Sequence, residues 1–96
     1  MATYTVRRSK HGTLVANTVD TVIFSSRPTS TEVRNLSSTA TIFFREDGTA
    51  PTVAGDDTYR LAPGETLQVD AENVEPPQIQ LISSGTPDYS VTAVPR

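Results

Sequence analysis

Hydrophobic and polar residues alternate along much of this 96-residue chain, a pattern that predicts β-strands. The clearest example runs from Thr39 to Arg45, where Ala40, Ile42 and Phe44 fall on one face. No window repeats its apolar residues at helical spacing. We therefore expect strands at seven places: 19–25, 32–36, 39–45, 59–61, 66–70, 78–83 and 89–94.

Turn-forming residues separate these segments. Asp47-Gly48 follows the strand at 39–45, and a polar stretch up to Thr58 contains proline, glycine and aspartate without periodicity. Ala62-Pro63-Gly64-Glu65 lies between two short strands and predicts a hairpin there. The pattern predicts one all-β domain, an antiparallel β-sandwich or small barrel of about seven strands.

The same alternation predicts the core. Segment 19–25 is apolar on both faces, so the sequence does not show which alternate residues face the core. A strand that is apolar on both faces suggests that its outer face is buried beneath a loop or a partner. The expected core residues are Val19 or Val22, Ile23, Phe24, Val33, Leu36, Ile42, Phe44, Leu61, Leu67, Val69, Ile79, Leu81, Tyr89 and Val91.

Residues 1–18 have a different character from residues 19–96. Basic residues Arg7, Arg8 and Lys10 gather beside His11, while apolar residues are few. Terminal segments with little apolar surface are poorly ordered unless another surface holds them. We expect an N-terminal arm at 1–18 that docks on a partner, followed by the β-sandwich domain at 19–96.

The amino-acid composition indicates where the protein is made and how its fold is stabilised. Hydrophobic residues make up 35% of the chain, so the core is thin and neighbouring subunits could add to its stability. The chain has no cysteine, no apolar run of about 20 residues and no apolar segment after its first charges. We expect a protein made in the cytoplasm, without a membrane partner.

Charge is distributed unevenly along the sequence. Residues 1–45 hold six of the eight basic residues and two acids (+4), whereas residues 46–96 hold two basic residues and nine acids (−7). If the two halves formed separate regions of the folded surface, this charge difference would orient the protein on a charged partner. If the sheets mix strands from both halves, the opposite charges would instead be spread evenly over the surface.

The sequence offers little for catalysis. His11 is the single histidine and lies in the basic segment, and the acids Asp47, Asp56 and Asp57 occupy turn sequences that match no calcium motif. We expect no enzyme activity, no metal and no cofactor. We also expect no nucleic-acid binding, because three basic residues in an acidic chain give only weak attachment to phosphates.

Six residues are candidates for binding a partner. The basic residues suit an acidic protein surface, although a solvated terminus would also account for them. Phe43 has the parity opposite to Phe44 and points outward, under either the long loop or a neighbouring subunit. The full set is Arg7, Arg8, Lys10, Phe43, Asp56 and Asp57.

The segment from Thr41 to Asp57, followed by Leu61-Ala62-Pro63-Gly64, resembles small virion structural proteins of tailed actinobacterial phages. The stretch Val33-Arg34-Asn35-Leu36-Ser37 resembles the segment that leads into this pattern. The similarity covers about residues 19–94 and leaves the N-terminal segment outside. Such families include head decoration, head fibre and tail proteins on similar folds, so the fold does not settle the role.

The resemblance implies a capsid decoration (cement) protein on the exterior of the virion. It would bind the major capsid protein of the assembled head, bridge capsid subunits and act as a homo-oligomer. The alternative is a host-surface or glycan-binding module of a tail or head fibre, or another minor tail protein. Glycan binding would need exposed aromatic residues, and the chain has three Tyr, three Phe and no Trp.

Overall fold

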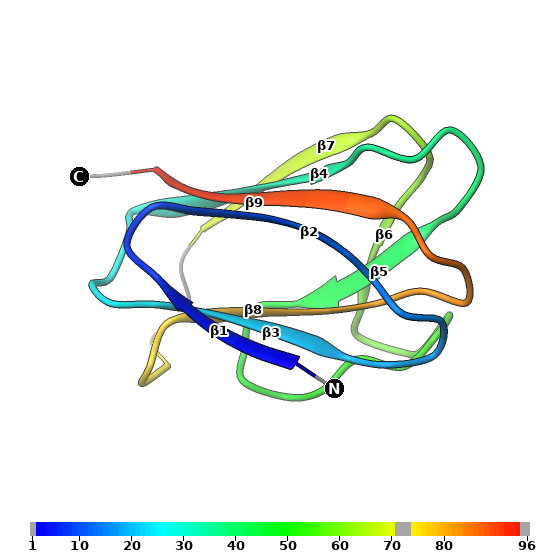
Figure 1. Cartoon of the computed structure of the whole chain (residues 1–96). Coiled ribbons are helices and arrows are strands. Elements are labelled where there is room, and N and C mark those ends of the chain that lie inside the picture. The colour runs from blue at the N-terminus through cyan, green and yellow to red at the C-terminus, as the bar shows by residue number, and fades with distance from the viewer. Residues whose placement is uncertain (1, 71–73, 95–96) are drawn as a thin grey trace.

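The computed structural model describes residues 2–70 and 74–94, which form nine strands and no helix. The strands pack as two facing sheets (Figure 1). Their bounds are β1 Ala2–Val6, β2 Ser9–Thr13, β3 Asp20–Phe24, β4 Ser30–Asn35, β5 Ile42–Arg45, β6 Tyr59–Leu61, β7 Thr66–Asp70, β8 Gln78–Ile82 and β9 Asp88–Val94.

The five-stranded sheet has the order β1-β3-β8-β5-β6, and the four-stranded sheet has the order β2-β9-β4-β7. The expected all-β fold is confirmed, as a sandwich-like pair of sheets. Two details differ from expectation: there are nine strands rather than about seven, and β1 pairs with β3 in parallel. The part of the chain that the structure describes contains no helix long and apolar enough to cross a membrane.

The two additional strands lie in the segment expected to be an arm. β1 extends the five-stranded sheet beside β3, and β2 extends the four-stranded sheet beside β9. Leu14, just after β2, is 1% exposed and belongs to the core. The arm expected at 1–18 is therefore wrong for the residues described there, because backbone pairing and Leu14 tie them to the domain.

The hairpin expected at 59–70 is also corrected. The turn forms as predicted: Glu65 N–H donates to the carbonyl of Ala62 (3.0 Å), and Gly64 has φ of 77° after Pro63. However, β6 pairs with β5 and β7 pairs with β4, so the turn joins one sheet to the other.

The core lies between the sheets and contains most of the expected residues. In β3 the even positions face inward, since Val22 and Phe24 are 0% and 2% exposed. Leu36 is an error in the expected core, because it is 55% exposed. Ile23 and Leu67 are only partly buried. The core cluster consists of Leu14, Val22, Phe24, Val33, Ile42, Phe44, Leu61, Val69, Ile79, Leu81, Tyr89 and Val91.

Candidate functional site

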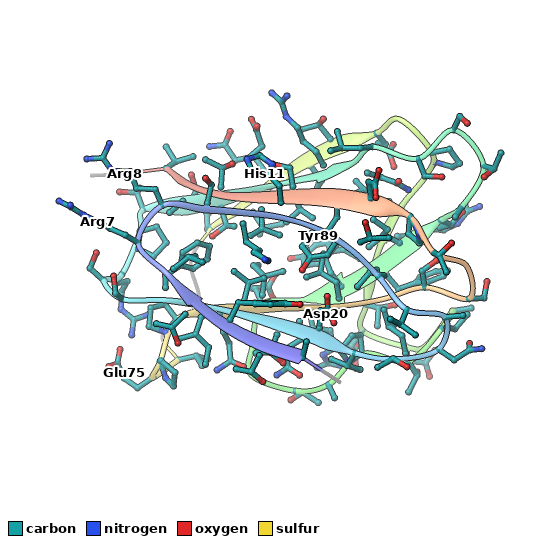
Figure 2. All side chains as sticks on the ribbon, viewed as in Figure 1. Arg7, Arg8, His11, Asp20, Glu75 and Tyr89 are labelled. Carbon is teal, nitrogen blue, oxygen red and sulfur yellow. The ribbon has the colours of Figure 1, made fainter. Side chains whose placement is uncertain are left out.

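Arg7 and Arg8 form the short connection between β1 and β2, and so between the two sheets. The backbone on both sides is fixed: Ser25 N–H donates to the Val6 carbonyl (2.9 Å), and Ala93 N–H donates to the Arg8 carbonyl (2.6 Å). Both arginine side chains are exposed and point away from the body at one end of the sandwich (Figure 2). We call Arg7 and Arg8 the basic turn.

Among the described residues, the arginines of the basic turn have no acidic partner, unlike Arg27, Arg34 and Arg45. Arg27, by contrast, forms an ion pair with Glu75 and donates to the carbonyl of Val74 (2.8 Å). Arg34 pairs with Glu32 at 2.9 Å. The two guanidinium groups of the basic turn therefore remain available to carboxylates of another molecule.

Lys10 does not join this group. It lies opposite the buried Val91 in the register of β2 and β9, and residues directly opposite share a face of the sheet. Its Nζ lies 3.9 Å from the centre of the Tyr4 ring, a cation–π contact at the edge between the sheets. The three basic residues expected to act together are thus divided, with Lys10 directed inward.

Next to this edge lies a buried polar pair that the sequence analysis did not single out. The Tyr89 hydroxyl donates to Oδ2 of Asp20 at 3.1 Å, and the two residues are 0% and 4% exposed. Burial, followed by the negative charge of Asp20, raises the pKa of Tyr89, so the phenol stays protonated. Asp20 lies two residues before Val22 and so on the same, inward face of β3. This position in the alternation is the one signal in the sequence that could have predicted the burial of Asp20.

Gly12 makes room for this pair. A Cβ atom at Gly12 would lie 3.1 Å from the Tyr89 hydroxyl oxygen and 3.2 Å from its ring carbons. The space beside Tyr89 is therefore filled, and the pair acts as a satisfied polar contact of the core. His11 is exposed and lies on the outer face of β2, on the other side of the sheet from Asp20.

The acids of the loop between β5 and β6 do not converge. Arg45 holds Asp47 in a two-point contact, with Nε to Oδ1 at 3.1 Å and Nη2 to Oδ2 at 2.5 Å, which lowers the pKa of Asp47. Asp56 and Asp57 are exposed. The described residues contain no group of three or more His, Asp or Glu side chains placed to hold a metal ion.

Phe43 is not an exposed anchor, which agrees with one of the two expected alternatives, cover by the long loop. It is 9% exposed and lies opposite Ile82, which is 7% exposed, on the outer side of the five-stranded sheet. Figure 1 shows the loop between β5 and β6 running along this side. The chain itself covers Phe43, so Phe43 needs no neighbouring subunit for its burial.

One cavity lies near the end of β3, but it is too small for a ligand. Its volume is about 10 Å³, enough for about one water molecule, whereas ligand pockets measure roughly 300–1,000 Å³. Its lining residues are Phe24, Pro28, Thr31, Glu46, Pro77, Gln78 and Ile79.

Comparison with known proteins supports the fold. No protein-family model and no curated protein matches the chain. The chain is similar to a de novo designed double-stranded β-helix, with a TM-score of 0.58 and 19% identity over 88% of this chain and 96% of that one. At this identity the similarity concerns the arrangement of strands alone.

Two further solved structures show weaker similarity. A conserved Streptococcus pyogenes protein of unknown function gives a TM-score of 0.47 at 19% identity, over 99% of this chain and 82% of that one. A mutant of a periplasmic inhibitor of g-type lysozyme from Escherichia coli gives 0.41 at 14% identity, over 94% of each chain. Neither similarity is strong enough to suggest a function.

Proposed function

We propose that this protein is a decoration (cement) protein of a tailed-phage head, which attaches to the exterior of the assembled capsid through its basic turn. The proposal rests on two kinds of support. The sequence of about residues 19–94 resembles small virion structural proteins of tailed phages. The structural feature that carries the proposal is the basic turn, which presents two exposed guanidinium groups on a fixed backbone.

The basic turn suits an acidic protein surface. A guanidinium can donate two parallel hydrogen bonds to one carboxylate, so Arg7 and Arg8 together can hold two acidic side chains of the shell. Each exposed pair contributes only about 0.2–1 kcal/mol. Firm attachment therefore depends on many copies acting together on the symmetric shell.

The placement of aromatic residues favours this function over glycan binding. Phe24, Phe44 and Tyr89 are buried, and Phe43 is nearly so. Tyr59 is 39% exposed, but its ring stacks on Phe44 with the centroids 5.0 Å apart. Tyr4 is partly buried, and Lys10 Nζ lies 3.9 Å from the centre of its ring. The two partly exposed tyrosine rings are therefore each already in contact with a neighbouring side chain, which disfavours stacking against a sugar ring. The proposal assigns the protein no catalytic step.

The test uses purified protein and heads assembled without it. We expect the protein to sediment with these heads and to raise the temperature at which they release DNA. The double variant Arg7→Glu, Arg8→Glu should bind the heads about tenfold more weakly or worse, because it places like charges against the acidic surface.

The matched control is Arg34→Glu with Arg60→Glu, which makes the same change of net charge at two exposed strand positions. It should retain most of the binding. Equal weakening by both double variants would show that overall charge, not the basic turn, directs attachment. A protein that ignores heads but sediments with tails or host envelope would disprove the decoration function.

A further inference from the structure

Four loops without charged residues lie at the end of the sandwich opposite the basic turn (Figure 1). Charged residues make up 20% of the chain, so these 20 residues would hold about four charges if charge were evenly spread. Glu65 and Asp88 border them. The loops are 14–19, 36–41, 62–64 and 83–87, which we call together the uncharged end.

Two buried polar residues hold these loops in place. Asn35 donates through Nδ2 to the carbonyls of Ala40 (2.7 Å) and Leu61 (3.0 Å). Ser83 donates through Oγ to the Thr41 carbonyl (2.6 Å), and its own carbonyl accepts from Asn17 N–H (2.7 Å). Because these bonds tie the loops to one another and to the ends of β4 and β6, the surface is organised before it meets a partner, which lowers the entropic cost of binding.

Two large apolar side chains are exposed on this surface. Val15 is 62% exposed and Leu36 is 55% exposed. They flank the same loop, since the backbone N–H of Leu14 donates to the Pro87 carbonyl (2.9 Å) and that of Leu36 donates to the Asp88 carbonyl (3.0 Å). Exposed apolar side chains with few charged residues among them are typical of the central part of protein interfaces, where charged residues are depleted.

We infer that the uncharged end binds the uncharged end of a second copy of this chain, across a two-fold axis. Two-fold pairing brings a surface against itself, so any net charge on it is repelled by the same charge on the partner. The basic turn cannot pair in this way because its arginines would repel one another. The loops of the uncharged end have no charge of their own, so like charges meet only at its border, at Glu65 and Asp88, and pairing buries Val15 and Leu36.

The size of the surface limits the strength of this pairing. The molecule measures 33 × 21 × 21 Å, so an end face of 21 × 21 Å covers about 440 Å² on each copy. Stable interfaces bury roughly 1,200 Å² or more in total. The dimer should therefore be weak and concentration-dependent, with a dissociation constant above about 1 µM.

The pairing does not depend on what the basic turn binds. The geometry of the dimer nevertheless bears on the proposed function. Pairing through the uncharged ends places the two basic turns at opposite ends of a dimer about twice 33 Å long. Such a dimer could reach two separate acidic sites on a shell. Sedimentation of the protein alone tests the pairing, so failure to bind heads would leave the inference standing.

Sedimentation velocity over a concentration series is the test. The unaltered protein should pass from monomer to dimer as its concentration rises. Leu36→Asp and, on a second loop, Val15→Asp should each raise the dissociation constant about tenfold or more. Both side chains are over half exposed, so both variants should melt at nearly the temperature of the unaltered protein.

The control is Ser26→Asp, which adds the same charge at an exposed position between β3 and β4, at the opposite end. It should dimerise like the unaltered protein. A protein that remains monomeric up to about 1 mM, far above the range of a specific weak dimer, would overturn the inference. Equal weakening by Ser26→Asp would overturn it as well, since the contact would then lie elsewhere.

Discussion

The Tyr89 phenol and the Asp20 carboxylate form a polar contact inside an apolar interior, and this contact should make stability depend on pH. Burial and the charge of Asp20 raise the pKa of Tyr89 above its ordinary value of 10.0. Below pH 10 the phenol is protonated in both the folded and the unfolded chain, so its contribution to stability is fully present. At higher pH the unfolded chain loses the proton first, and the free energy of unfolding falls.

We predict that Tyr89→Phe removes this alkaline loss. In the unaltered protein Tyr89 should lower the free energy of unfolding by up to about 1.4 kcal/mol per pH unit above pH 10. At neutral pH the variant should be about 1–3 kcal/mol less stable, because Asp20 loses a donor. Urea unfolding at neutral and alkaline pH measures both effects. An identical alkaline slope in the two proteins would contradict the assignment.

Individual residues also show where the sequence pattern succeeds and fails. The alternation of a strand correctly places Val22 and Ile23 on opposite faces of the sheet. It cannot show which of the two faces is buried, because both carry apolar side chains. Applied strictly, the same alternation places Leu36 opposite to Val33. Asn35, the residue before Leu36, takes the inward position, and its side-chain amide donates hydrogen bonds to the carbonyls of two other segments. A local pattern in the sequence cannot reveal such contacts between segments.

At the scale of elements, β1 and β2 are the strands that the sequence concealed. Their apolar faces are weak: β1 presents Ala2, Tyr4 and Val6, and β2 presents Lys10 and Gly12. What holds them is backbone pairing with β3 and β9, which depends on strands more than ten residues away. By contrast, β6 and β7 were predicted to the residue, but their assignment to different sheets was not.

Deletion of residues 1–18 should unfold the domain. The deletion removes an edge strand from each sheet and the buried Leu14, and it uncovers the interior beside Tyr89. Loss of Leu14 alone should cost about 2–5 kcal/mol, a large part of the stability of a domain this small. Circular dichroism and thermal melting give the answer. A shortened protein that melts like the full chain would restore the view of this segment as an accessory arm.

Over the whole molecule, the uneven charge of the sequence is redistributed by topology. β8 lies between β3 and β5, and β9 lies between β2 and β4, so strands from the acidic half separate strands from the basic half. The sequence polarity therefore does not become two charged faces. Charge differs instead between the two ends of the sandwich. One end carries the basic turn, and the loops of the other, the uncharged end, have no charged residues.

The two ends should respond differently to salt. Raising the ionic strength from about 0.05 M to about 0.5 M should weaken attachment to heads, since exposed charges are screened beyond a few ångströms. The same change should leave self-association unchanged or slightly stronger, because apolar contacts are not screened. Sedimentation with and without heads at both ionic strengths measures the two effects. Parallel weakening would show that both contacts are electrostatic.

The order of strands also sets a requirement on how the chain folds. Each hydrogen-bonded pair joins segments well separated in the sequence, and the strands at the centre of the sheets, β8 and β9, come after their partners β3, β5, β2 and β4. Such long-range pairing slows folding to roughly milliseconds to seconds. During synthesis on the ribosome, the earlier strands must wait with unpaired edges until residues 78–94 emerge, so the nascent chain is exposed to aggregation until β8 and β9 are available.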